Sequence, residues 1–204
     1  MTPESPSSGY PFGRAALALH RRAPTATGPL ALVEVFINTR AYPSMPDQLG
    51  DARALGHWLT AHGLATADTL VLPSDVLVAI EVREALRALI LANTTGDERP
   101  TAALEVLSRL GAQAPVHPTF DVAGVRLECD GQGVVRALSR LLAIVAVAMI
   151  DGSWAHLKAC RSEACRSAFY DATRNHSGQW CTPALCGVRE RARMFRARHR
   201  RSRR

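Results

Sequence analysis

The chain has 204 residues, of which 47% are hydrophobic and 21% charged, as is typical of a soluble globular protein. This composition excludes wholesale disorder, a collagen-like repeat and a small disulfide-rich scaffold. The net charge of +7 is uneven, because residues 158–204 hold 13 Lys or Arg and 3 Asp or Glu, a net +10. Residues 1–157 hold 12 basic and 15 acidic groups. A near-neutral body therefore precedes a strongly cationic end, which favours an acidic partner.

Residues 1–28 are rich in Pro, Ser, Gly, Ala and Thr and show no sustained hydrophobic period. We interpret them as a flexible N-terminal arm, part of which could dock through a few apolar side chains. These side chains are Tyr10, Phe12, Leu17 and Leu19. The first eight residues lack the basic region and apolar run of a signal peptide, so we expect a cytoplasmic protein.

The first strongly apolar run covers residues 30–37, and its β-branched content favours a strand, with a short buried helix as the alternative. After a Pro-rich turn, apolar side chains recur at helical spacing up to Gly63, which is a suitable end for a helix. The side chains that show this spacing are Leu49, Ala52, Leu55, Leu59 and His62.

A further helix is predicted to begin at a cap formed by Ser74 or Asp75 and to end within residues 93–96. Its apolar face consists of Val78, Val82, Ala85, Leu86, Leu89 and Ile90. Residues 102–110 predict another helix, which we expect to close at Gly111.

The hydrophobic period then changes, and residues 116–120 and 125–129 predict a hairpin or paired strands. Residues 133–150 return to a long apolar helix. Its most apolar part, residues 141–150, is too short to span a bilayer, which takes about 20 residues, so we expect a buried helix and no membrane contact. The fold class predicted for residues 29–152 is α+β, with helices packed on a small sheet.

Four of the five cysteines cluster as Cys160-x4-Cys165 and Cys181-x4-Cys186. Two close pairs joined by a loop of fifteen residues can supply the four thiolates of a tetrahedral zinc site. Such a site has no open position, so the zinc would be structural. An iron–sulfur cluster would use the same ligands.

Other side chains in this region have simpler interpretations. We interpret His176 as a loop residue, although it could replace a thiolate, and Cys129 as a core or strand cysteine. Phe169, Tyr170 and Trp180 are expected to form a miniature core beside the metal. Gly187 is expected to let the backbone turn tightly around a sulfur.

These segments resemble a known zinc-binding family. Residues 160–165, 169–175, 180–181 and 186–189, with the Arg-rich stretch that follows, resemble the CGNR zinc finger. In that family the finger follows an α/β domain called ABATE, and the proteins are regarded as stress-induced transcriptional regulators of bacteria. The body resembles this domain in residues 32–39, which end in Asn38-Thr39, and in residues 82–86.

The resemblance covers about residues 30–200. It implies zinc as the cofactor, an ABATE-like domain at residues 29–152, and a finger with its Arg-rich helix at residues 153–204. One position departs from the pattern, because Val188 stands where the family has the Asn of its name motif.

Residues 188–204 predict a helix with an apolar stripe of Val188, Ala192 and Phe195 that could pack on the finger. Four arginines at positions i, i+4, i+7 and i+11 form a cationic face suited to phosphate oxygens. They are Arg189, Arg193, Arg196 and Arg200.

The leading hypothesis is a DNA-binding regulator whose body senses a ligand or forms a homodimer. Binding to RNA or the ribosome, or to an acidic protein surface, would use the same charge. We find no nucleophile elbow, phosphate loop or metalloprotease motif and therefore expect no enzyme activity.

Overall fold

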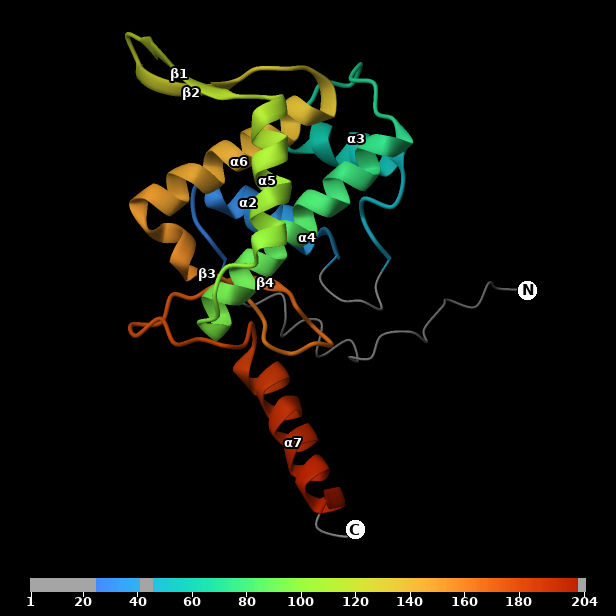
Figure 1. Ribbon diagram of the computed structural model, residues 1–204, viewed down its shortest axis with the longest axis vertical. Helices are drawn as coiled ribbons and strands as arrows, with labels where there is room; N and C mark the ends of the chain where they lie inside the picture. Colours follow the sequence, from blue (N-terminus) through green and yellow to red (C-terminus); the bar gives the residue numbers. More distant parts are fainter. Residues whose placement is uncertain (1–24, 41–45, 202–204) are drawn as a thin grey trace, which may run out of the picture.

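The computed structural model describes residues 25–40 and 46–201. The residues up to 24, which include Tyr10 and the other apolar side chains of the predicted arm, lie outside this part. The body is a bundle of helices capped at one end by a hairpin, and a last helix leaves it at the other end (Figure 1). The helices of the body are α2 (Leu30–Ile37), α3 (Ala52–Ala61), α4 (Pro73–Thr95), α5 (Thr101–Gln113) and α6 (Gly133–Asp151).

Residues 30–37 form helix α2, so the preferred strand prediction is wrong and the alternative, a short buried helix, is correct. The run is apolar on nearly every position, and a pattern of this kind does not distinguish the two structures. Packing decides, because Leu30, Val33 and Ile37 follow helical spacing and lie in the core. A 3-10 turn, η1 (Asn38–Arg40), follows directly.

The next two helices follow the sequence prediction with one difference at a cap. Helix α3 ends before Gly63, whose φ is +66°, and α4 ends at Gly96, whose φ is +76°. The N-cap of helix α4 is Leu72, two residues before Ser74 and three before Asp75, the two caps predicted from the sequence. Asp75 stabilises the start of the helix from within its first turn, because its carboxylate accepts a 2.8 Å hydrogen bond from the Leu72 amide.

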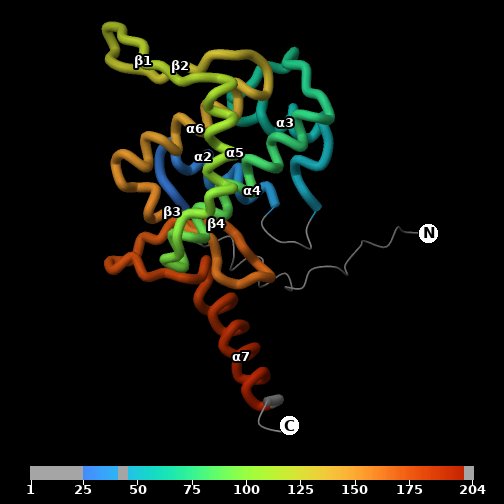
Figure 2. The backbone as a smooth tube through the Cα atoms, viewed as in Figure 1, coloured from blue at the N-terminus to red at the C-terminus, as the bar shows by residue number. Residues whose placement is uncertain are grey.

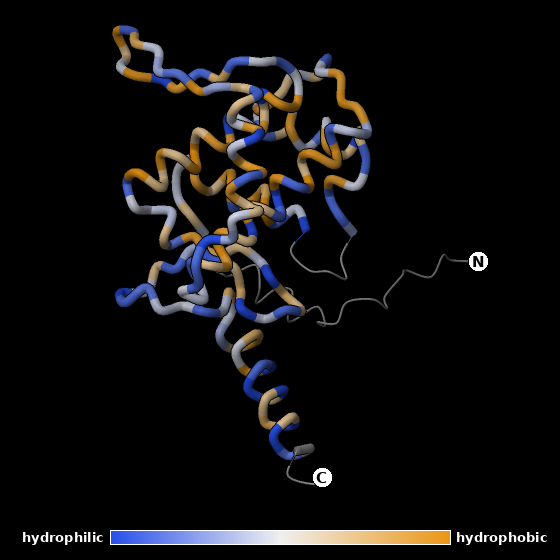
Figure 3. Tube along the Cα trace, viewed as in Figure 1, coloured by the Kyte–Doolittle hydropathy of each residue, from blue (hydrophilic) through white to orange (hydrophobic). Residues whose placement is uncertain are grey.

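The predicted hairpin is confirmed as β1 (Val116–Asp121) and β2 (Gly124–Cys129), which pair antiparallel. Helix α5 continues through Gly111 instead of closing there. The predicted long helix is α6, whose length and composition alone would allow it to cross a membrane. In the structure, Leu138, Leu141 and Val145 of α6 lie in the core of the body. Figure 3 shows hydrophobic residues along the helices of the body and mostly hydrophilic residues along the last helix.

After α6 and the turn η2 (Ser153–His156), the chain forms a second antiparallel sheet of β3 (Leu157–Ala159) and β4 (Ala168–Tyr170). Figure 2 shows this segment lying against the end of α4. Leu157, Ala159 and Ala168 belong to the core of the body. The α+β class is confirmed, and the sheet on which helices pack is β3–β4, whereas the hairpin β1–β2 is largely uncovered.

Glu34 is a buried acid within α2, where it is 4% exposed and accepts a 2.6 Å hydrogen bond from the Ala26 amide. Burial raises its pKa from 4.5 to about 7, although the bond from Ala26 opposes this. The folded state therefore favours the protonated carboxyl. Its contribution to stability is complete below pH 4.5 and is lost as the pH rises through about 7.

The Glu34→Gln variant keeps a hydrogen-bond acceptor for Ala26 but cannot titrate. We expect its free energy of unfolding at pH 8 to exceed that of the wild type by about 1–3 kcal/mol, with no difference at pH 4.5. Urea unfolding at a series of pH values measures both. A variant that is less stable than the wild type at pH 8 would contradict this account.

Candidate metal centre

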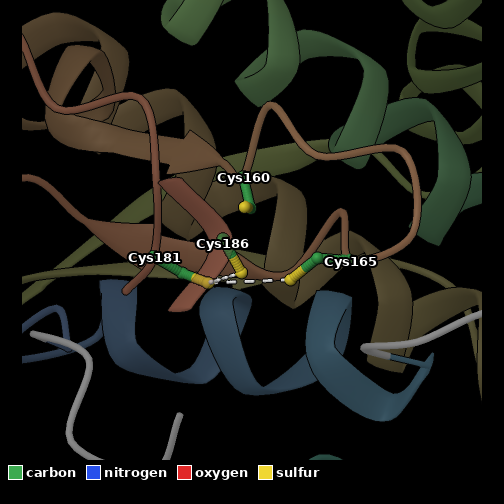
Figure 4. Close-up of side chains that lie close together, drawn as sticks. All are labelled: Cys160, Cys165, Cys181 and Cys186. Carbon is green, nitrogen blue, oxygen red and sulfur yellow. Dashed lines mark hydrogen bonds between the residues drawn. The ribbon is translucent and has the colours of Figure 1, made fainter. Parts of the chain in front are cut away.

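Four cysteines from two separate turns meet beside the β3–β4 sheet (Figure 4). Cys160 follows β3 directly, and Cys165 lies in the connection between the two strands. Cys181 and Cys186 lie near the end of the chain, just before the last helix. All four are buried, and their Sγ atoms lie within 4.8 Å of one another. The structure therefore brings together all four metal ligands predicted from the spacing.

The distances between sulfur atoms fit a tetrahedral ion. The Sγ of Cys181 lies 3.6 Å from that of Cys165 and 3.7 Å from that of Cys186. With Zn–S bonds of about 2.3 Å, tetrahedral geometry places neighbouring sulfurs about 3.8 Å apart. Four thiolates fill the coordination sphere, so the site suits a structural zinc.

Crowding and burial favour the protonated form of one of the thiols. Hydrogen bonds with the neighbouring thiols, together with burial, raise the pKa of Cys181 above its ordinary value. Because zinc binds thiolates, the ion would both displace these protons and neutralise the charge left behind. The Oγ of Ser167, 3.2 Å from the Sγ of Cys165, gives that sulfur a polar neighbour.

Each cysteine pair lies on a tight turn, as the spacing predicts. In the first turn, the amides of Cys165 and Arg166 both donate to the carbonyl of Ser162, and Arg166 adopts a φ of +53°. In the second, the amide of Cys186 donates to the carbonyl of Thr182 at 2.8 Å. This second turn is the short helix η3 (Pro183–Gly187).

The aromatic side chains divide between two cores. Phe169 and Trp180 pack on the cysteine cluster, as expected, whereas Tyr170 packs on the core of the body. Gly187 has a different role from the one predicted, because its φ is not positive. A Cβ at this position would lie 3.2 Å from Cδ1 of Trp180, so the glycine makes room for the indole.

His176 and Cys129 lie outside the cluster. The Nδ1 of His176 is 3.3 Å from the carbonyl oxygen of Asp171, and its ring packs on that of His156. Cys129 is buried at the base of the hairpin, at the end of β2. The interpretation of His176 as a loop residue and of Cys129 as a strand cysteine agrees with this placement.

Comparison with known families assigns both parts of the chain. Residues 30–152 match the ABATE family, described as "Putative stress-induced transcription regulator", and residues 156–199 match the CGNR zinc finger. The chain belongs to the ABATE family and carries a CGNR zinc finger. Zinc is therefore the metal that the four buried cysteines hold. A search of curated proteins finds no match.

The CGNR finger and the ABATE body share polar contacts as well as a core. Asn38 donates to the carbonyl of Ala168 at 3.0 Å and accepts from its amide at 2.9 Å. On the other strand, the hydroxyl of Thr94 donates to the carbonyl of Ala159 at 2.7 Å and lies 3.1 Å from its amide. Arg87 of α4 donates to the carbonyl of Arg166, beside the first pair of cysteines.

A buried ion pair organises the loop between β4 and Cys181. The Nζ of Lys158 lies 2.7 Å from the carboxylate of Asp171, and both side chains are almost fully buried. Burial alone would raise the pKa of Asp171, but hydrogen bonds from Lys158, Thr173 and Gly178 hold it well below its usual range. Gly178 is required, since a Cβ there would lie 2.9 Å from the Asp171 carboxylate.

The Lys158–Asp171 pair is not predicted from the sequence. The available signal was that Lys158 is the only lysine in a chain with 25 basic residues, and that it stands two residues before the first ligand. Nothing in the sequence indicates Asp171 as its partner. Lys158 lies in β3 and Asp171 directly follows β4, so the two residues meet only when these strands pair.

Helix α7 (Val188–Arg201) begins directly after the last ligand turn and extends away from the body (Figure 1). The prediction that its apolar stripe packs on the finger is wrong, because Val188 is 49% and Phe195 61% exposed. The helix leaves the body, and nothing within residues 25–40 and 46–201 covers this stripe. Val188, where the family pattern has Asn, is the first residue of α7 and is half exposed.

Three of the four arginines of the predicted cationic face, Arg189, Arg193 and Arg196, are exposed along α7, and the side chain of Arg200 lies outside the described part. Arg193 is paired with Glu190 through a 2.7 Å bond from its Nε. Arg191 and Arg198 are also exposed, so arginines extend over much of the helix surface.

Replacement of one ligand should remove the metal. We expect one zinc per wild-type chain and none in Cys181→Ser, because three thiolates and a hydroxyl bind zinc far more weakly. Cys129→Ser, outside the cluster, should keep one zinc per chain. Metal analysis of protein purified under reducing conditions measures this, and a zinc-free wild type would disprove the assignment.

Breaking the buried ion pair should destabilise the finger. Lys158→Met leaves the Asp171 carboxylate buried without its cation, and we expect a loss of about 3–5 kcal/mol in the free energy of unfolding. The double variant Lys158→Met/Asp171→Asn should regain part of this loss, since it removes the uncompensated charge. Urea unfolding of the three proteins tests it, and a double variant no more stable than the single one would contradict the role of charge.

Proposed function

We propose that this ABATE–CGNR protein is a DNA-binding transcription regulator in which zinc fixes the start of α7 and α7 contacts the DNA. The observation that carries the proposal is the position of α7. An arginine-rich helix leaves the body from the metal centre, and all of its described side chains except Glu190 are exposed. Arginine binds phosphate oxygens through paired hydrogen bonds and stays charged at all relevant pH values.

The shape and charge of this region suit duplex DNA. A single helix fits the width of the major groove, where it can reach both phosphates and base edges. The net +10 of residues 158–204 would attract the polyanion, whereas the near-neutral body would contribute little to this attraction. The metal would act at a distance from the DNA, because its four thiolates are buried and leave no coordination site for a ligand.

The same features favour binding over catalysis. A closed four-thiolate zinc site does not activate water, which requires an open coordination position. The five cysteines form no disulfide in the described structure, which suits a reducing compartment and supports a regulator that acts in the cytoplasm.

The dependence of affinity on salt tests the role of α7. About five neutralised phosphates give a slope of log K against log salt near −4 to −5 on duplex DNA. Arg193→Ala/Arg196→Ala should weaken binding and flatten the slope by about one unit per lost contact. The matched control, Arg53→Ala/Arg99→Ala, removes the same charge from exposed positions of the body and should leave the slope unchanged.

The affinities for duplex DNA, RNA and an acidic protein distinguish between the possible partners. Binding to one duplex sequence in preference to others would support the regulator, because charge alone reads no bases. Equal or tighter binding to RNA would favour an RNA-associated protein, and binding to an acidic protein with no affinity for nucleic acid would overturn the proposal.

The pairing of Glu190 with Arg193 provides a test in the opposite direction. Glu190→Gln removes a negative charge and the acceptor that holds Arg193 on the helix surface. We expect this variant to bind duplex DNA more tightly and with a slope about one unit steeper. An unchanged affinity and slope would contradict a contact between this part of α7 and the DNA, and a weaker affinity would show that Arg193 must be held by Glu190 in order to bind.

A further inference from the structure

The hairpin β1–β2 divides cleanly into two faces. In its register, Val116 faces Cys129 and the pairs alternate from there to the turn. One face is entirely apolar and consists of Val116, Pro118, Phe120, Val125, Leu127 and Cys129. The opposite face consists of His117, Thr119, Asp121, Gly124, Arg126 and Glu128. Strict alternation of this kind is typical of a sheet with one buried face.

Apart from Cys129, which is buried, the apolar face is nevertheless exposed in the single chain. Phe120 is 80% and Val125 62% exposed, and the hairpin extends beyond the helices (Figure 1). A hairpin of two strands gains little stability unless one face is covered. Monomeric proteins seldom leave a continuous apolar surface of this kind in water.

This face continues onto the body. Leu127 of the hairpin lines a groove of about 520 Å³ together with Leu32 of α2 and with Ile144 and Val147 of α6. Val147 and Ile150, near the end of α6, add exposed apolar surface. Arg140 and Asp151 also line the groove, so a mainly apolar surface extends from the hairpin turn to α6. We call it the hairpin–α6 surface.

Charge on the hairpin is confined to the polar face and is paired there. Arg126 forms an ion pair with Asp121, His117 lies 3.5 Å from Asp130, and Arg136 of α6 lies 3.6 Å from Glu128. The hairpin lies at the opposite end of the molecule from α7 (Figure 1). Two chains that meet through their hairpins would keep their cationic helices apart, whereas contact through α7 would be opposed by repulsion.

We propose that the hairpin–α6 surface is the interface of a homodimer. The occupant must cover an apolar face as long as six residue pairs, which is too long for a small ligand in the groove. A second copy offers a face of the same length and chemistry. In an antiparallel twofold arrangement, the turn of each hairpin lies over the groove of its partner, and both apolar faces are buried together.

This inference is independent of the proposed nucleic-acid binding, because the interface and the test involve no nucleic acid. We expect sedimentation of the full zinc-loaded chain to give twice the 22.1 kDa mass of one copy at micromolar concentration. Phe120→Asp and Val125→Asp should each raise the dimer dissociation constant roughly tenfold or more, since a carboxylate would be buried without a partner.

Leu77→Asp serves as the matched control. Leu77 is an exposed leucine on α4, outside the hairpin–α6 surface, and its replacement should leave the dimer unchanged. Zinc content and thermal unfolding of each variant confirm that the chain remains folded. Hydrogen exchange should show the amides of residues 116–129 becoming better protected as protein concentration rises.

Three results would overturn the proposal. The first is a wild type that stays monomeric at 100 times the micromolar concentration of the sedimentation experiment. The second is a dimer that Phe120→Asp and Val125→Asp leave intact. The third is a monomer that sediments with phosphatidylcholine vesicles and loses this property in Phe120→Asp, since the apolar face would then serve a lipid surface.

Discussion

The β3–β4 sheet depends on two side chains from the body that act in place of missing strands. Ala159 and Ala168 face each other in the sheet, and the amide and carbonyl of each point outward to an open edge. Thr94 of α4 bonds both groups of Ala159, and Asn38 bonds both groups of Ala168. A sheet of two three-residue strands has little stability of its own, so these bonds place it on the body.

Because the sheet carries the first cysteine pair, the metal centre is fixed to the body through it. Leu157 and Ala159 lie in the core of the body, and Cys160 follows at once in the cluster that surrounds the metal. The family boundary near residue 152 therefore does not separate two independent folding units. Asn38, Thr94 and Arg87 thus hold the segment that carries the first cysteine pair against the body, and the metal links this segment to the turn that precedes α7.

The sequence predicted the features that depend on local pattern. The cysteine spacing predicted the metal site, and the hydrophobic period predicted α3, α4, α6 and the hairpin. Residues 30–37 were assigned wrongly because an apolar run without alternation leaves the choice to tertiary packing. Strands of three residues such as β3 and β4 have no detectable period, and the Lys158–Asp171 pair exists only through their register. The position of α7, away from the described part of the body, is not revealed by any pattern within the helix.

The burial of Lys158 determines the chemistry of the exposed surface. It is the only lysine of the chain, and its ammonium group is enclosed by Asp171 and backbone carbonyls. All other basic residues are arginines, apart from histidine. Acetylation of lysine commonly weakens the binding of a protein to polyanions, because it removes a positive charge. This surface offers no accessible side-chain amine for that modification. Its positive charge is insensitive both to acyl transfer and to any rise in pH within the range that cells experience.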